Sequence, residues 1–373
     1  MKALKVVHII EALGGGIYSY FVELTHSFGD LENVETTIIF SDKRKEIDPK
    51  QIYEDFNKNI NLIKIPMKRE LSASADYKAF LKIKKVLEEI KPDVIHLHSS
   101  KAGVLGRAAY YFSGSDAQLY YTPHGYSFLR KDISVIKKFF FFCIEKLTQK
   151  FFGGKTIACG DTELTYSERI GPVTLVRNSV NLTKIRTVKT ENEQKPLTIG
   201  ILGRITYARN PELFNVLALR HPEINFMWIG DGELLDKLTA PNITITGWYT
   251  DQKKALRKLN SIDIYLQTSS WEGLPIALLE AMALEKPILA TNIIGNKDIV
   301  KHGETGYLFN TIYEFDNYLF FLQDERTREI FGKNSLARCE ELFDSRKNFK
   351  QLIDLYWEEY INNDVQTNLS KVH

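Results

Sequence analysis

Strand-like and helical segments alternate along almost the whole of this 373-residue chain. This alternation constrains the fold strongly, because a helix between two strands returns the chain to the same edge of the sheet and makes the strands parallel. Short apolar runs predict strands at residues 5–10, 35–40, 61–65, 93–98, 118–122, 155–159, 173–176, 197–202, 225–229, 243–246, 262–266 and 288–290. The clearest helical runs are 75–90, 103–112, 133–152 and 161–170. We therefore predict an α/β protein with two doubly wound, Rossmann-like domains that face a central cleft.

A polar stretch without hydrophobic periodicity separates the two sheets. It covers residues 189–196, so we predict a linker there between a first domain at 1–188 and a second domain at 197–345. The remaining residues, 346–373, are expected to form an amphipathic helix followed by a frayed tail.

Composition excludes several classes of protein. Three widely spaced cysteines, Cys143, Cys159 and Cys339, form no Cys-x-x-Cys, which argues against a disulfide framework or a zinc site and favours a reducing cytoplasm. The apolar run at the N-terminus is interrupted by His8 and ends at Glu11, so it is predicted to be a strand rather than a signal peptide. No run of about eighteen apolar residues is present to span a membrane.

The net charge of +2 is unevenly distributed. Residues 1–188 contain 28 Lys and Arg against 21 Asp and Glu, a balance of +7, and the remainder contains 21 against 26, a balance of −5. A basic first half favours an anionic partner or surface on that side. We expect this to be an anionic membrane, and we expect no nucleic-acid partner.

One motif points to chemistry. Two carboxylates, Glu272 and Glu280, are separated by seven residues that include Gly273 and Pro275, and the flanking runs predict strand, loop, helix and strand. Pro275 is expected at the first helical position, where free backbone N–H groups bind anions. Glutamates beside such a site can accept hydrogen bonds from the hydroxyls of a nucleotide sugar. The alternative is an ordinary core helix with two solvated glutamates.

This motif, Glu-Gly-Leu-Pro followed by Glu-Ala-Met-Ala, resembles the signature of the retaining glycosyltransferases of family 4. The resemblance covers essentially the whole chain and implies the GT-B fold, with the acceptor on the first domain and the nucleotide sugar on the second. It also implies that the last helix crosses back onto the first domain. By the same resemblance, Glu272 orients the transferred sugar, Glu280 binds the ribose, and the diphosphate lies against the backbone of Gly273, Leu274, Pro275 and Ile276.

Two further loops follow strands and contain glycine. Gly15 and Gly16 lie in a glycine cluster that, in the resembled family, faces the donor; the alternative is a tight turn. Gly203 and Arg204 match the family's Gly-Arg, but Arg209 stands where the family has lysine. Both arginines would stabilise the departing diphosphate, unless they are simply a surface pair.

Several other positions are assigned by the same resemblance. His124, at a strand end, matches the histidine that faces the transferred sugar, and Gly247 and Trp248 lie where the family places the nucleobase. Asn178 lies near the hinge and is assigned to the acceptor side.

A histidine pair in the first domain leaves several interpretations open. His96 and His98 point to the same face of one strand, so they can bind a metal, but no third ligand stands out in the sequence. Acceptor contact or strand packing is the preferred interpretation, and His98 and Lys101 are therefore placed on the acceptor side.

No two aspartates are separated by a single residue, so the Asp-x-Asp metal clamp of the other large glycosyltransferase fold is missing. We therefore expect no metal ligands and no cofactor; a nucleoside-diphosphate sugar, UDP-linked, is expected as a substrate.

The helical run at 133–152 is rich in both lysine and phenylalanine. A core-facing stripe of Ile136, Phe140, Ile144, Leu147 and Phe151 would leave two phenylalanines, Phe139 and Phe142, to enter a membrane interface. The alternative is a fully buried helix.

These observations predict a metal-independent, retaining glycosyltransferase. The resemblance is to enzymes of capsule, O-antigen or exopolysaccharide synthesis, which implies a lipid-linked glycan acceptor and a cytoplasmic location, peripheral on the inner face of the plasma membrane. Two other functions stay open. A nucleotide-sugar 2-epimerase shares the architecture, although its acidic catalytic residues cannot be matched here. A non-catalytic nucleotide-sugar-binding protein is the second alternative, against which the arginine and glutamate positions argue. The sugar, acceptor and linkage cannot be deduced from these residues.

Overall fold

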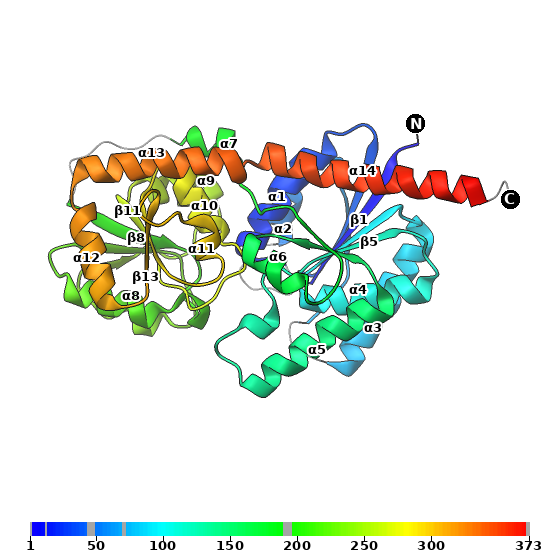
Figure 1. Ribbon diagram of the computed structural model, residues 1–373, viewed down its shortest axis with the longest axis horizontal. Helices are drawn as coiled ribbons and strands as arrows, with labels where there is room; N and C mark the ends of the chain where they lie inside the picture. The colour runs from blue at the N-terminus through cyan, green and yellow to red at the C-terminus, as the bar shows by residue number, and fades with distance from the viewer. Residues whose placement is uncertain (1, 12, 43–48, 69–71, 189–195, 371–373) are drawn as a thin grey trace. The chain divides into compact units, whose positions relative to one another are not determined.

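The computed structural model describes residues 2–11, 13–42, 49–68, 72–188 and 196–370 and divides into two compact units (Figure 1). Unit 1 comprises Met1–Arg177 and Arg346–His373, and unit 2 comprises Asn178–Ser345. Each unit has a wholly parallel sheet, as the alternation of strands and helices predicts.

Unit 1 contains a seven-stranded sheet with the order β3-β2-β1-β4-β5-β6-β7. Its strands are β1 (Leu4–Ile10), β2 (Val34–Phe40), β3 (Asn61–Lys64), β4 (Val94–His98), β5 (Gln118–Thr122), β6 (Lys155–Ala158) and β7 (Val173–Leu175). The strand order reverses between β1 and β4, and their register places His8 opposite His96. Loops at such a reversal are the usual ligand site of a wound sheet.

Helices cover both faces of this sheet (Figure 1). One face carries α1 (Gly16–Gly29), α2 (Pro49–Asp55) and α14 (Ser345–Ser370), and the other carries α3 (Ala73–Ile90), α4 (Ser100–Ser113) and α5 (Val135–Phe152), with α6 (Asp161–Ser167) following β6. The apolar core on the first of these faces includes four buried side chains of α14: Phe349, Leu352, Ile353 and Tyr356. The helix continues to Ser370 through the part of the chain where a frayed tail is expected.

Unit 2 contains a six-stranded sheet with the order β10-β9-β8-β11-β12-β13. Its strands are β8 (Thr198–Leu202), β9 (Asn225–Ile229), β10 (Ile243–Ile245), β11 (Ile264–Gln267), β12 (Ile288–Thr291) and β13 (Gly306–Phe309). The helices are α7 (Leu182–Arg186), α8 (Pro211–Arg220), α9 (Gln252–Asn260), α10 (Ile276–Ala283), α11 (Asn296–Ile299), α12 (Ile312–Leu322) and α13 (Glu325–Leu342).

The edge strand β13 is not predicted from the sequence, because it has only four residues and begins with glycine. The glycine has a structural cause: a Cβ on Gly306 would lie 2.0 Å from the Ile288 carbonyl oxygen of the neighbouring strand. Pairing with β12 therefore requires the residue that makes the strand hard to recognise.

The division between the units falls after Arg177, eleven residues before the predicted boundary at residue 188. The segment that follows is held by unit 2: the Asn178 amide donates to the Leu274 carbonyl (3.3 Å), Val180 pairs with Asp344, and α7 packs on α10. Of the predicted linker, residues 189–195 lie outside the described part of the chain.

Candidate active site

The site in unit 2 is built on loops that follow β8, β9 and β11. The indole N–H of Trp228 donates to the Gly203 carbonyl (2.9 Å), and a Cβ on Gly230 would lie 2.2 Å from that same oxygen. A Cβ on Gly232 would lie 2.3 Å from the Ile205 carbonyl oxygen. The two glycines after β9 thus allow close backbone contact with the loop that contains Arg204.

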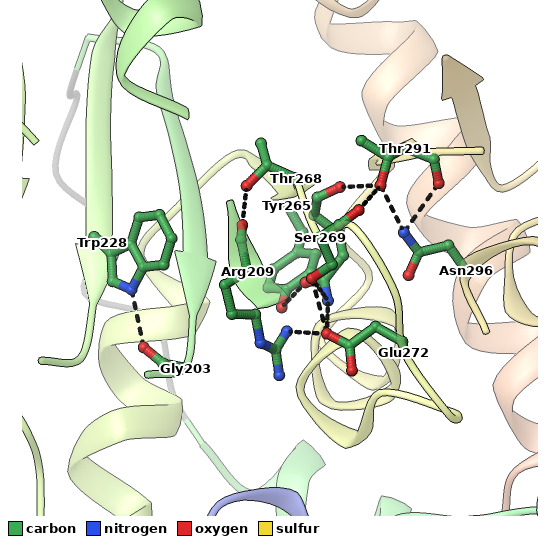
Figure 2. A network of polar contacts seen from close by, with 10 residues as sticks. Gly203, Arg209, Trp228, Tyr265, Thr268, Ser269, Glu272, Thr291 and Asn296 are labelled. Carbon is green, nitrogen blue, oxygen red and sulfur yellow. Dashed lines mark hydrogen bonds and ion pairs between the residues drawn. The ribbon is translucent and has the colours of Figure 1, made fainter. Parts of the chain in front are cut away.

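Arg209 ends a short 3-10 turn, Tyr207–Arg209, and is fixed through its backbone. Its carbonyl accepts a hydrogen bond from the Thr268 hydroxyl (2.7 Å), and the carbonyl of Ala208 accepts from the Ser270 N–H (2.8 Å). These two bonds join the loop after β8 to the loop after β11, which places the Arg209 side chain beside Glu272 (Figure 2).

Glu272 is held by three contacts to one carboxylate oxygen. Its Oε1 accepts from the Ser269 hydroxyl (2.8 Å) and the Gln267 amide (3.1 Å), and lies 3.2 Å from Arg209 Nη1 (Figure 2). The Arg209 contact is an ion pair without the alignment of a hydrogen bond, and both side chains are less than one-fifth exposed. None of these contacts uses Oε2. The arrangement fixes the carboxylate while leaving its second oxygen for a ligand hydroxyl.

Glu272 is supported by a shell of polar side chains, those of Tyr265, Gln267, Thr291 and Asn296, which was not identified from the sequence. Fully buried Gln267 accepts from the Tyr265 hydroxyl (2.9 Å), and burial raises the pKa of that tyrosine, which therefore stays a donor. The Thr291 hydroxyl donates to the Ser269 carbonyl (2.6 Å) and is joined to Asn296 (3.2 Å) (Figure 2).

Gly295 explains how the loop after β12 reaches this shell. A Cβ on it would lie 2.5 Å from the Gly273 carbonyl oxygen, and its φ is +87°. The polar strand end and following glycine at 291–296 repeat the pattern by which the other loops were found, so this signal was available in the sequence.

Glu280 lies on α10, which begins at Ile276. Pro275, which is predicted at the first helical position, is instead the N-cap residue one position earlier, since its ψ of 114° is extended. Glu280 is buried, and its Oε1 accepts from the Gln252 amide (3.2 Å), which in turn accepts from Lys184 (3.1 Å). Asn178 also lies here: its bond to the Leu274 carbonyl supports the loop before α10, and its acceptor-side role stays a prediction.

Three other donor-side glycine positions have distinct geometries. Gly15 precedes α1 with φ +56° and open space around its α-carbon, so backbone conformation rather than packing requires glycine. Gly16 begins the helix. Gly247 has φ +74°, and Trp248 beside it is 39% exposed, which leaves the indole accessible to a ligand.

His124 occupies a strained position in unit 1, just after β5. Its φ is +51°, unusual for a residue with a side chain, and the next N–H, of Gly125, donates to Glu163 Oε2 (2.7 Å). Its Nε2 lies 3.0 Å from His98 Nδ1. Burial lowers the pKa of His124 to about 4, so the imidazole is neutral at pH 7.

His98 and Lys101, which the sequence assigns to the acceptor side, are both enclosed by contacts within unit 1. His98 has no exposed surface, and both of its ring nitrogens contact other histidines, His124 and His8. Lys101 is largely buried in an ion pair with Asp76, at 2.6 Å. The third histidine that the sequence failed to indicate is His8, which the β1–β4 register places beside His96 and His98.

Helix α5 buries the face opposite to the one predicted to be buried. Its buried side chains are polar: Glu145 accepts from the hydroxyls of Tyr121 (3.0 Å) and Ser100 (3.0 Å), and Gln149 accepts from Arg107 (3.0 Å). Burial raises the pKa of Glu145.

The outer face of α5 is apolar, and six of its side chains are more than half exposed: Val135, Ile136, Phe139, Phe140, Leu147 and Phe151. The predicted core stripe is therefore wrong, because the buried polar network, not the apolar stripe, fixes the inner face. Phe139 is exposed as expected, but Phe142 packs against Phe128 at 5.4 Å between ring centroids. Among the described helices, none is both long enough and apolar enough to cross a bilayer.

Known proteins are similar to this chain in sequence. The family described as Glycosyltransferase Family 4 matches residues 14–184, and the family described as Glycosyl transferases group 1 matches residues 183–337. The chain is 28% identical over 326 residues to the Escherichia coli UDP-Gal:alpha-D-GlcNAc-diphosphoundecaprenol alpha-1,3-galactosyltransferase, covering 79% of this chain and 82% of that enzyme. It is 24% identical over 327 residues to the Staphylococcus aureus capsular polysaccharide biosynthesis glycosyltransferase CapM, covering 78% and 83%.

Solved structures agree in fold. A sucrose-phosphate synthase from Thermosynechococcus elongatus aligns with a TM-score of 0.81 at 15% identity, covering 96% of this chain and 100% of that one. Anabaena HepE in complex with UDP-glucose aligns with a TM-score of 0.76 at 16% identity, covering 95% and 100%. The family models and relatives thus identify the chain as a glycosyltransferase, and its two parallel sheets give it the GT-B fold. Within that class, the chain belongs to the glycosyltransferases described by these two family models, which together span residues 14–337.

Proposed function

We propose that this enzyme is a metal-independent, retaining hexosyltransferase that moves a sugar from a UDP-linked donor to a hydroxyl of a lipid-linked glycan. The observation that carries the proposal is the carboxylate of Glu272 next to the cation of Arg209. Its Oε1 accepts the hydrogen bonds that fix it, and none of these contacts uses Oε2. The names of the E. coli and S. aureus relatives support a place in surface polysaccharide synthesis.

Charge determines the roles in this mechanism. As the bond to the anomeric carbon breaks, negative charge grows on the diphosphate, and Arg209 with Arg204 stabilises it. Backbone N–H groups at the start of α10 supply further donors. Because Oε1 of Glu272 already has two hydrogen bonds and a cation, this carboxylate is a weak nucleophile. It orients a sugar hydroxyl instead, and retention follows if the acceptor attacks from the face that the diphosphate leaves.

A transfer assay tests the proposal. The purified enzyme is incubated with UDP-hexoses and a diphospholipid-linked N-acetylglucosamine, with and without EDTA, and the anomeric configuration of the product is determined by NMR. We expect transfer with retention that EDTA does not reduce. An inverted product, or activity that EDTA abolishes and Mg²⁺ restores, would contradict the mechanism. Interconversion of the donor without acceptor would instead identify the epimerase.

Glu280→Ala should weaken nucleotide binding by about ten- to a hundredfold, because a ribose hydroxyl loses a charged acceptor worth about 1.5–3 kcal/mol. Calorimetry with UDP measures the effect. Glu304→Ala is the matched control, since that carboxylate is exposed in a pair with Lys301 in the same unit. Equal affinities for the two variants would remove Glu280 from the ribose site.

We also propose that α5 holds the enzyme on an anionic membrane. A helix with polar residues inside and phenylalanines outside does not have the pattern of a solvent-facing helix. Exposed lysines, Lys137, Lys146 and Lys150, lie on the same helix, and each contributes about 1 kcal/mol near an anionic surface. The excess positive charge of residues 1–188 adds to this attraction.

Replacing Val135, Ile136, Phe139 and Phe140 together by serine should abolish co-sedimentation with phosphatidylglycerol vesicles, because the apolar contact is lost while the lysines remain. UDP binding should be unchanged. The matched control is Phe320→Ser with Phe321→Ser, since both side chains are more than half exposed on α12 of unit 2. If the four-residue variant sediments with vesicles as the parent does, α5 is not the membrane contact.

A further inference from the structure

Four histidines form a polar array inside the otherwise apolar core of unit 1. His8 on β1 and His96 and His98 on β4 have no exposed surface, and His124 follows β5. His8 Nδ1 lies 3.0 Å from His98 Nε2, and His98 Nδ1 lies 3.0 Å from His124 Nε2. The array therefore leads from the centre of the sheet to the strained His124, which lies at the carboxyl end of β5.

The protonation of His96 follows from its neighbours. The Thr122 hydroxyl donates its single proton to the Ile157 carbonyl (2.9 Å), so it must accept from His96 Nε2 (2.8 Å). His96 Nδ1 then accepts from the Tyr356 hydroxyl (2.5 Å), whose pKa is raised well above its usual value by burial. His96 is thus an Nε2–H tautomer with both nitrogens satisfied, which leaves neither available to the substrate.

The other three histidines form a directional chain. Burial lowers the pKa of His8 to about 3 and that of His98 well below its usual value, so each ring is neutral and carries one N–H. Two directions are compatible with the distances. Either His8 donates to His98 and His98 to His124, or every proton lies on the opposite nitrogen.

The inner end of the chain distinguishes these directions. His8 Nε2 is buried and meets no hydrogen-bond partner among the residues that the structure describes. The Phe21 and Phe28 rings are T-shaped to the His8 ring, and their centroids lie 6.1 and 5.8 Å from the His8 ring centroid, which is wider than a close N–H···π contact. In proteins, a buried N–H without an acceptor is rarer than a buried acceptor without a donor. His8 Nε2 is therefore the nitrogen without a proton, and Nδ1 carries the proton.

We infer that His8 and His98 are positioning residues that hold His124 in its Nδ1–H tautomer, so that its outer ring nitrogen is a hydrogen-bond donor. His8 Nδ1–H donates to His98, His98 Nδ1–H donates to His124, and His124 Nδ1–H is left for a ligand. Resting on the proposed function, that ligand is a hydroxyl oxygen of the transferred sugar. His124 in this state cannot remove a proton through Nδ1.

NMR of the full-length protein, labelled with ¹⁵N-histidine and measured at pH 8, tests the inference without any substrate. Two-bond ¹⁵N–¹H correlations separate protonated from bare ring nitrogens. We expect protonated Nδ1 in His8, His98 and His124, and protonated Nε2 in His96. His302 is an internal reference for a ring with protonated Nε2, because its Nδ1 accepts from the Leu308 N–H (3.0 Å). Protonated Nε2 in His124 would overturn the inference.

The variant His8→Phe keeps a ring in the core but removes the first donor. His98 and His124 should then show averaged tautomers while His96 is unchanged; an unaltered His124 would show that His8 does not position it. Added Zn²⁺ supplies a separate outcome, since stoichiometric binding that shifts His8, His96 and His98 together would replace the chain by a metal site. If no sugar donor is used in the transfer assay, the proposed function fails, but the tautomers still decide this inference.

Discussion

Replacing Arg209 by alanine is expected to lower kcat by about a hundredfold or more. The loop that contains Arg209 is fixed by hydrogen bonds from the Thr268 hydroxyl and the Ser270 N–H, and the guanidinium is the cation paired with Glu272. Removing one preorganised charge from the leaving-group site costs on the order of 10²–10³ in turnover. Arg209→Lys should retain part of the activity, because a lysine supplies the charge without the planar fork.

Steady-state kinetics with a UDP-hexose and the lipid-linked acceptor measure this effect, with thermal unfolding as a check on folding. Arg220→Ala is the matched control: Arg220 is also paired with a carboxylate in unit 2, that of Asp316, but its side chain is 55% exposed. The control should be close to the parent enzyme. Near-normal turnover of a folded Arg209→Ala protein would exclude Arg209 from the mechanism.

Glu272→Gln and Glu272→Ala are expected to separate catalysis from stability. The glutamine keeps an oxygen that can accept from Ser269 and Gln267, but it replaces Oε2 by an NH₂ donor and removes the charge opposite Arg209. Its kcat should fall by about a hundredfold with little change in Tm. The alanine should lose as much turnover and also about 1–3 kcal/mol of stability, because the polar groups around it lose their acceptor.

Kinetics and calorimetry on the same preparations give both quantities. A glutamine variant with parental turnover would mean that neither the charge nor Oε2 of Glu272 is used. If the two variants unfolded at the same temperature, Ser269 and Gln267 would not depend on this carboxylate.

The sequence was sufficient for those features that depend on local pattern. Strand and helix periodicity placed the strands other than β13, and glycine at strand ends indicated the loops that contain Gly203 and Gly273. It was insufficient wherever a partner lies far along the chain. His8 joins His98 across ninety residues only because β1 pairs with β4, and no spacing rule contains that register.

The orientation of α5 shows a second limit. Its sequence is apolar on more than one face, so periodicity alone does not select the buried side. The choice depends on Glu145, which is buried because Tyr121 and Ser100 supply donors. Prediction assigns carboxylates to the surface, and this helix departs from that expectation.

Unit 1 is built from two segments that lie far apart in the sequence, and this has a consequence for protein synthesis. Its apolar core includes Phe349, Leu352 and Tyr356 of α14, and the hydroxyl of Tyr356 is also bonded to the buried His96 of β4. On a ribosome, which adds residues from the N-terminus onward, the whole of unit 2 is translated before α14 exists. The first unit to be started is therefore the last that can be finished, and until α14 emerges the nascent chain must carry an open apolar surface.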